Sequence, residues 1–390
     1  MGSLFAKSLH RHFKWWLLAL WPGRHPGAPL GLRRLLFLLL GYPLFLCLQL
    51  IHWVGFFCDE LFFSAYRKIQ VNDPVFVLGI PRSGTTFLHR TLAADQEQFT
   101  SFSTWEALLA PSITERKLIA GLAAADRAVG GPFRYLLDRL LRGAAGDFND
   151  IHAVDLRAAE EDYLGLLPTG SCFILLLAFP FATELRQLGH LDGMPAAERA
   201  RLMRFYKGLL QKHLYAHPGK RLLSKNAAFS TWGPTLQATF PQAKFLICLR
   251  EPVSALSSQL SALAPARRLF GTDPDGSATA DCFSAIYADG YKSLARFVTS
   301  CPPCQAALIA QADLKAAPAQ TIRAALEQLD LESSTSLRQA LAELHPAPPS
   351  AHQHSPDEWP IDAQQIRDCM QHNYEAMLRA ENRVLNQSPT

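Results

Sequence analysis

The feature that most constrains the fold is a short apolar run that ends in a glycine-rich loop. Residues 74–80 read PVFVLGI, and the next ten residues read PRSGTTFLHR. A short run rich in β-branched residues and bounded by turn residues is typical of a buried parallel strand. Phe87, Leu88 and Leu92 then have the spacing of one helix face. This order of strand, loop and helix predicts an α/β domain with a mostly parallel sheet.

The same order recurs later in the chain. KFLICL at 244–249 predicts a second buried strand, followed by a turn and the helix VSALSSQLSAL. Residues 171–181 fit either a strand or a buried helix, because periodicity does not separate the two. Helical patterns cover residues 106–143, 195–217 and 313–344, and a short strand could end at 222–224. In such a fold, ligands bind beyond the carboxyl ends of the strands.

The loop itself has the spacing of a phosphate-binding P-loop, because four residues separate Gly79 from Gly84. Its backbone N–H groups and the positive end of the next helix can hold an anion. However, Thr85 stands where nucleotide triphosphatases have a lysine, and the cation inside the loop is Arg82. We therefore expect a phosphate ester other than a nucleoside triphosphate.

Two segments carry a resemblance to a known family. PRSGTT after an apolar strand resembles the 5′-phosphosulfate loop of the P-loop-like sulfotransferase superfamily, in the branch of bacterial and tyrosylprotein sulfotransferases. Residues 222–260 resemble that family's lysine segment, strand, and the arginine and serine that hold a 3′-phosphate. The resemblance implies the donor 3′-phosphoadenosine 5′-phosphosulfate (PAPS), without a metal. It implies donor contacts from Arg82, Ser83, Gly84, Thr85, Thr86, Phe87, Arg250 and Ser258.

The resemblance also implies catalytic residues. Lys225, helped by Arg82, is expected near the leaving oxygen, and Glu106 in STWE is expected to take the acceptor's proton. His152 is the second candidate for the base. The carboxylates of Glu160, Glu161 and Asp162 are a further alternative, although a solvated helix start explains them equally well. Tyr287 and Tyr291 could stack on adenine or belong to the core.

An apolar segment lies near the N-terminus of the chain. Residues 35–58 contain no Asp, Glu, Lys or Arg, and about 20 such residues suffice to cross a bilayer. Trp15, Trp16, Trp21 and Trp53 suit an interfacial belt. Pro43, Gln49 and His52 weaken a plain spanning helix, so a kinked, shallow insertion and a helix buried in the core stay open. We expect a membrane-associating region at 1–72 and a sulfotransferase domain at 73–390.

The functional prediction is therefore sulfuryl transfer from PAPS to a hydroxyl of a small-molecule, lipid or glycan acceptor at a membrane. A net charge of +4 gives no reason to expect nucleic-acid binding. Two alternatives are a membrane-associated kinase or nucleotide triphosphatase, and a nucleotide-binding scaffold without turnover. The catalytic domain would be cytoplasmic in a bacterium, or lumenal behind a single span in the Golgi. The CPPC pair Cys301 and Cys304 has no second half-site, which favours ordinary thiols.

Overall fold

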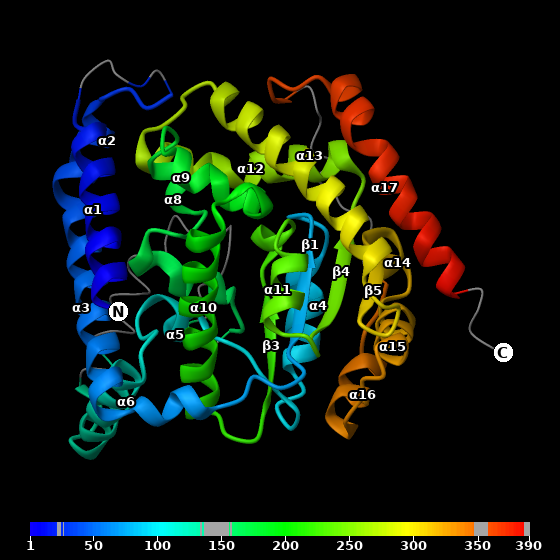
Figure 1. Ribbon diagram of the computed structural model, residues 1–390, viewed down its shortest axis with the longest axis horizontal. Coiled ribbons are helices and arrows are strands. Elements are labelled where there is room, and N and C mark those ends of the chain that lie inside the picture. The colour runs from blue at the N-terminus through cyan, green and yellow to red at the C-terminus, as the bar shows by residue number, and fades with distance from the viewer. Residues whose placement is uncertain are drawn as a thin grey trace.

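The protein is built around a parallel sheet whose strand order is β2-β3-β1-β4-β5 (Figure 1). The computed structural model describes residues 1–21, 25, 27–132, 135, 156, 158–346 and 358–385. The strands are β1 (Val75–Gly79), β2 (Phe99–Thr100), β3 (Arg221–Lys225), β4 (Lys244–Leu249) and β5 (Ala306–Ala310). The α/β fold with a parallel sheet is thus confirmed. Because β1 is the middle strand, the loop that follows it lies at the centre of the carboxyl edge.

Alternate residues along the strands enter different hydrophobic cores, as expected for a pleated sheet covered on both faces. In β1, Val75 and Val77 join a core with helices α4 (Thr85–Ala93) and α15 (Pro318–Gln328), whereas Phe76 and Leu78 join the larger core on the opposite face. All five residues of β1 are buried. The sequence therefore has a continuous apolar run here instead of an alternating one.

The helices largely follow the predicted ranges. The helix after β4 runs on through Pro265 to Phe270, and residues 171–181 contain only one helical turn, α8. The first helices are α1 (Gly2–Ala19), α2 (Leu32–Leu36), α3 (Tyr42–Phe62), α4 (Thr85–Ala93), α5 (Thr104–Leu108) and α6 (Ile113–Ala128). Those that follow are α8 (Leu175–Ala178), α9 (Thr183–Arg186), α10 (Ala196–Ala216), α11 (Gly233–Thr239), α12 (Pro252–Phe270) and α13 (Ser277–Ser300). The last are α14 (Gln311–Ala316), α15 (Pro318–Gln328), α16 (Thr335–Ala342) and α17 (Ala363–Leu385).

The apolar segment forms a continuous helix of 31 residues, Leu32–Phe62, long and apolar enough to cross a membrane. A π-helical turn at Phe37–Gly41 joins α2 to α3, directly before Pro43. Proline lacks the N–H that an α-helix would use, and the wider turn absorbs this loss. Figure 1 shows α1 and α3 side by side along one edge of the molecule, beyond α10.

One face of this helix is part of the larger core. Gln49 and His52 are buried, and the His52 imidazole lies 2.6 Å from the Glu115 carboxylate of α6. The expected interfacial belt is wrong for two of its tryptophans: Trp15 is fully buried, and the buried Trp53 indole donates to the Pro168 carbonyl at 3.0 Å. The polar residues that weakened a plain span thus face the protein.

Candidate active site

The loop after β1 has the backbone of an anion-binding site. Arg82 (φ 70°) and Gly84 (φ 98°) both have left-handed conformations, which turn successive N–H groups toward one side before α4 begins at Thr85. A Cβ on Gly79 would lie 2.3 Å from the Cys248 carbonyl oxygen, so only glycine allows β1 and β4 to approach this closely. The loop therefore presents backbone donors and the positive end of α4 to a ligand.

The structure brings Arg82 together with Arg250 and Ser258, which lie more than 160 residues further along the chain. The Arg82 Nε donates to Ser258 Oγ at 3.2 Å, and Arg250 Nη1 donates to the Arg82 carbonyl at 3.0 Å. Burial, and then the charge of Arg82, lower the pKa of the Arg250 guanidinium. Two cations held this close repel each other, and an anion between them would remove that repulsion. This is the arrangement expected around a phosphate.

Further side chains fix this part of the loop. Gln311, the first residue after β5, donates to the Arg82 carbonyl at 2.9 Å. The buried Tyr287 hydroxyl donates to the Pro81 carbonyl at 3.2 Å, and the buried Tyr291 hydroxyl to the Arg250 carbonyl at 2.5 Å. The two tyrosines therefore brace the loop from the core. Ser83 Oγ is buried and finds no hydrogen-bond partner among the described residues, as expected of a donor meant for a ligand.

Lys225 ends β3 and is only 3% exposed, so it is not an ordinary surface lysine. Its Nζ donates to Glu161 Oε1 at 2.7 Å and to Thr86 Oγ1 at 3.3 Å, and it lies 3.8 Å from Glu160 Oε1. The ammonium group thus stands between the phosphate-binding loop and two carboxylates. Such a cation can stabilise negative charge that develops beside the loop.

Asp162 differs from its two neighbours. Its buried carboxylate accepts hydrogen bonds from the Tyr206 hydroxyl at 3.0 Å and from the Asn226 amide. Burial raises the pKa of Asp162 to about 6. The Asn226 side-chain oxygen in turn accepts from the backbone N–H of Tyr163 at 3.1 Å. Asp162 and Asn226 therefore fasten the 160–163 segment to the end of β3 and so place Glu161 on Lys225.

A cavity of about 630 Å³ opens beside these groups. Its polar end is lined by the loop, Lys225 and the two carboxylates. Most of the remaining lining is apolar and comes mainly from α8, α12 and α13 and from residues beside them: Leu108, Leu164, Phe173, Ile174, Leu177, Ala262, Leu263, Ala266, Phe283 and Ile286. The polar side chains of Arg90, Thr104, Ser230 and Gln259 also line it. The cavity therefore joins a charged end to a long apolar end.

Glu106 lies outside that lining. It is 5% exposed in the first turn of α5, where its carboxylate caps the backbone N–H of Ser103 at 2.9 Å. Arg116 Nη1 and His217 Nε2 lie 3.1 and 3.0 Å from Glu106 Oε1. Burial alone would raise the pKa of Glu106, but the hydrogen bond from His217 and the charge of Arg116 hold it well below its usual range.

Glu106, His213 and His217 are close enough together to suggest a metal site. Arg116 Nη1, however, lies 3.1 Å from both Glu106 Oε1 and His213 Nδ1. Its guanidinium takes the position of a cation, so we assign the cluster a structural role.

The other predicted site residues differ in whether they line the cavity. Thr85 and Thr86 line the cavity, whereas Phe87 is 43% exposed on α4 and does not. His152 lies outside the described residues. Sequence reasoning missed Gln311, because the short strand β5 before it, AALIA, was not recognised within its alanine-rich surroundings. A search for polar residues directly after every short apolar run would have found it.

Comparison with known proteins agrees with this geometry. A family model described as "Sulfotransferase family" matches residues 74–131 and 181–336, which is more than half of the chain. The chain belongs to the sulfotransferase family. A comparison with curated protein sequences gave no significant match.

Two solved sulfotransferases share the fold. STF1 from Mycobacterium tuberculosis H37Rv has 18% identity and a TM-score of 0.67, over 94% of this chain and 91% of that one. STF9 from Mycobacterium avium has 16% identity and a TM-score of 0.65, over 82% and 80%. At these identities the likeness concerns the fold, and the residue roles in this sulfotransferase must be argued from its own site.

Proposed function

We propose that this sulfotransferase transfers the sulfuryl group of PAPS to a hydroxyl of a lipid-like alcohol. The observation that carries the proposal is the meeting of Arg82 with Arg250 and Ser258 beside a largely apolar cavity that Arg82 and Lys225 line. These four side chains come from the ends of three neighbouring strands and the helix after β4. Together they offer an anion site on each side of the loop.

The chain's donors fit a ligand with two anionic groups. Arg250, Ser258 and Arg82 would hold the 3′-phosphate, because charge-assisted hydrogen bonds from guanidinium groups are strong and suit its geometry. Ser83, Thr85 and Thr86 would bind the 5′-phosphosulfate together with the loop's N–H groups. The bound donor would supply an activated sulfuryl group and a phosphate leaving group.

Lys225 would stabilise the charge that grows on the leaving phosphate oxygen. Its position next to Thr86 supports this role, because the loop hydroxyl and the ammonium are 3.3 Å apart. Glu161 would hold the ammonium group in place through their 2.7 Å ion pair. Little reorganisation would then be needed during transfer, which is how preorganised charges accelerate such reactions.

For the base we favour Glu161 over the other candidates. A base must reach the acceptor hydroxyl, and Glu161 lines the cavity next to Lys225. Glu106 does not line it, and its carboxylate is occupied by Arg116, His217 and the α5 cap. Glu160 and His152 are the alternatives that mutagenesis would reveal.

The apolar end of the cavity favours a lipid-like acceptor over a glycan, because a sugar would leave its hydroxyl groups unpaired there. The N-terminal helix supports a membrane source. Arg34 of α2 is buried and donates to the Ala178 carbonyl of α8 at 3.2 Å and to the Phe270 carbonyl of α12 at 3.4 Å. Helices α8 and α12 are walls of that apolar end, so the membrane-associating helix is attached directly to them.

The test is transfer of ³⁵S from labelled PAPS into lipid extracts, with the product identified by mass spectrometry. Lys225→Met should lose transfer by at least a hundredfold, whereas the exposed Lys292→Met should retain it. Labelled lipid from the Lys225→Met enzyme at the wild-type rate would refute the assignment. Label in a glycan instead of a lipid would correct the acceptor alone.

A further inference from the structure

The N-terminal part of the chain has an unusual charge distribution. Residues 1–58 contain no Asp or Glu and six Lys or Arg residues, a formal charge of +6. The whole chain has 38 basic and 34 acidic residues, which leaves 32 basic and 34 acidic residues, or −2, for the remainder. The positive charge of the protein is thus concentrated in the same segment as its most apolar helix. Such a combination is typical of segments that bind anionic lipid surfaces.

The outer face of the α2–α3 helix is apolar along its length. It exposes hydrophobic residues at helical spacing, among them Leu44 at 72% and Val54 at 63% exposure. Leu17 of α1, Trp21 just after that helix, and Leu118 and Leu122 of α6 are exposed as well. The other exposed large hydrophobic residues on α2–α3 are Leu32, Leu36, Leu39, Leu40, Leu50, Ile51, Phe57, Leu61 and Phe62. We call this surface the apolar edge; it is too large to be ordinary water-facing surface.

The opposite face of the same helix is bound to the catalytic domain from end to end. Arg34 lies at its start, His52 in its middle and Asp59 near its end, all with buried polar partners. Asp59 accepts from the Lys212 ammonium of α10 at 2.8 Å and from the backbone N–H of Ile113 at 3.0 Å. A helix that crossed the bilayer would carry these polar groups and the domain into the hydrocarbon, at high cost.

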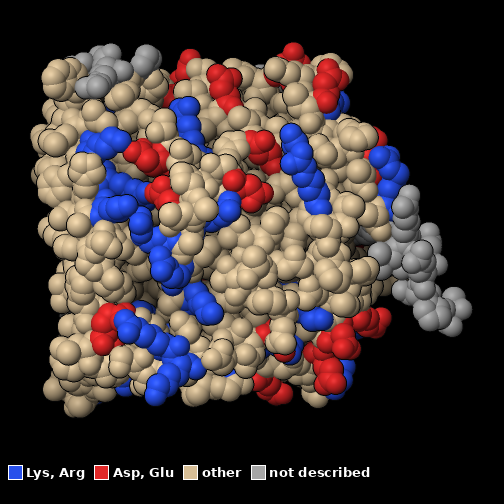
Figure 2. Space-filling view, in the orientation of Figure 1, with Lys and Arg blue, Asp and Glu red and all other residues tan. Residues whose placement is uncertain are grey.

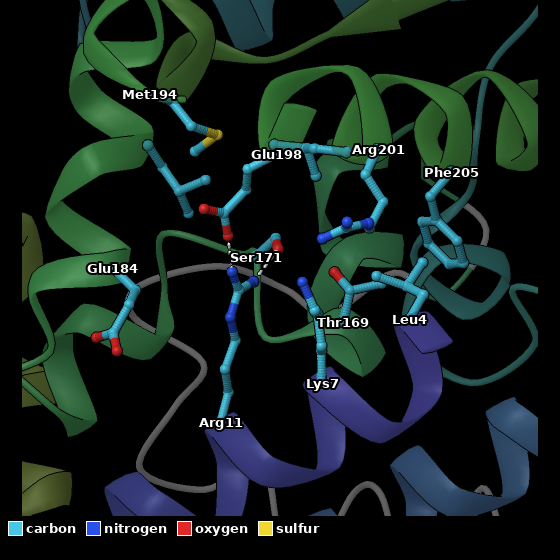
Figure 3. Close-up of a pocket in the computed structure, with 12 residues that line it drawn as sticks. Leu4, Lys7, Arg11, Thr169, Ser171, Glu184, Met194, Glu198, Arg201 and Phe205 are labelled. Atoms are coloured by element: carbon cyan, nitrogen blue, oxygen red, sulfur yellow. Dashed lines mark hydrogen bonds and ion pairs between the residues drawn. The ribbon is translucent and has the colours of Figure 1, made fainter. Parts of the chain in front are cut away.

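Basic side chains border the apolar edge. Figure 3 shows Lys7 and Arg11 of α1 and Arg201 of α10 pointing into one cleft, next to Thr169 and Ser171. Arg11 pairs with Glu198, but neither Lys7 nor Arg201 has an acidic partner within 4.0 Å in the part of the chain that the structure describes. The basic residues that line an adjoining cavity of about 550 Å³ are Arg67, Arg201, Arg204, Lys207 and Lys212. Glu60 also lines it and pairs with Arg67, and Lys212 pairs with Asp59. Figure 2 shows Lys and Arg side chains, with some Asp and Glu among them, in a band that runs from the region of α1 toward the middle of the molecule, beside the uncharged left edge where α3 lies.

We propose that the apolar edge lies in the plane of an anionic bilayer, with both ends of the α2–α3 helix on the same side. The apolar side chains enter the outer acyl region, and the basic band, which contains Lys7, Arg201, Arg204 and Lys207, binds lipid phosphates. This deepens the membrane association proposed above and does not depend on sulfuryl transfer. An in-plane position also keeps α8 and α12, the walls of the apolar cavity, next to the lipid from which an acceptor would come.

The first experiment uses protein made without detergent in a cell-free system and added to phosphatidylglycerol vesicles. Cys47 is exposed on the apolar edge, and Cys304 and Cys369 are exposed elsewhere. A water-soluble maleimide should label Cys304 and Cys369 but not Cys47, as read by peptide mass spectrometry. Equal labelling of all three on vesicles would overturn the proposal. Protection of Cys47 without vesicles, together with a doubled mass in light scattering, would assign the edge to a second copy of the chain.

The second experiment separates an in-plane helix from a spanning one. Gly31 and Ser64 flank the helix and are exposed, so Gly31→Cys and Ser64→Cys place a thiol at each end. An impermeant maleimide added outside sealed vesicles should label both. Labelling at one end only would show a span and overturn the proposal.

The third experiment tests the lipid charge. Replacing Arg204 and Lys207 by Glu should weaken binding to phosphatidylglycerol vesicles at least tenfold, because two attractive charges become repulsive. The same charge change at the exposed Lys292 and Lys315 should leave binding unchanged. Equal binding of wild type to phosphatidylcholine vesicles would refute the role of anionic lipid.

Discussion

Replacing Glu106 by Gln tests the difference between the residue that the motif implies and the residue that the geometry favours. The substitution keeps the shape of the side chain, and one amide oxygen can still accept from Ser103. It removes the charge that compensates Arg116, whose side chain is 7% exposed and lies 3.1 Å away. Breaking a buried ion pair by removing one partner costs about 3 to 5 kcal/mol. Because the hydrogen bond from Ser103 to residue 106 survives, we expect the free energy of unfolding to fall by the lower end of this range, about 3 kcal/mol.

The assay is urea unfolding together with the transfer rate at a temperature where the variant stays folded. We expect the free energy of unfolding to fall by about 3 kcal/mol, whereas kcat changes less than tenfold. Glu327→Gln, at an exposed position on α15, is the matched control and should change neither. A hundredfold loss of kcat with unchanged stability would refute this reasoning and make Glu106 the base.

Two further predictions concern residues of the site, and a third concerns the buried residue His12 of α1. Glu161→Gln should lower kcat by roughly 10² to 10⁴ while donor affinity stays within a few-fold, and Glu160→Gln should cost less than tenfold; a reversed order in single-turnover kinetics would move the base to Glu160. Arg250→Ala should weaken binding of adenosine 3′,5′-bisphosphate at least tenfold in calorimetry but leave adenosine 5′-phosphosulfate nearly unaffected, with the exposed Arg268→Ala as control. Burial lowers the pKa of His12 to about 4. The unfolded chain then binds the proton first, so stability should fall as the pH drops from about 6.5 toward 4, by up to roughly 3 kcal/mol. A melting temperature that falls as steeply in His12→Leu would contradict this.

The sequence predicted the carboxyl edge of the sheet well because the signals for the loop and the strand ends are local. A glycine-rich loop after a buried strand fixes its own backbone, so the placement of Arg82 and the start of α4 followed from neighbouring residues. Lys225 and Arg250 were also placed correctly beside strand ends, because parallel strands bring their carboxyl ends to one edge. The family pattern grouped Ser258 with Arg250, and the hydrogen bond from Arg82 to Ser258 was not predicted.

Our preference for Glu161 as the base could not have been reached from the sequence, because it depends on contacts between distant residues. Glu106 has a capping position in its own helix, and nothing near it in the sequence indicates that Arg116 and His217 occupy its carboxylate. The same applies to Glu161, which reaches Lys225 only because Asp162 binds Asn226 and Tyr206. The sequence also gives no sign that Asp162, the last of three consecutive acidic residues, is buried.

The N-terminal helix shows a similar limit. Its length and composition predicted membrane contact, and Gln49 and His52 were correctly seen as unusual for a plain span. Only the fold shows that these residues share one buried face, while the exposed residues are apolar apart from Arg33 at the start of the helix. Hydropathy averages over both faces, so it does not separate a spanning helix from one that lies in the interface.

The central claim is that this sulfotransferase uses a donor with a phosphate at each end. The most direct measurement is single-turnover transfer of ³⁵S from PAPS into membrane lipid by wild type and by Arg250→Ala at a donor concentration that saturates the wild-type enzyme. We predict that wild type forms a labelled lipid and that the variant recovers transfer only at much higher PAPS. Equal transfer at equal donor by both proteins, or no lipid product from wild type, would contradict the account.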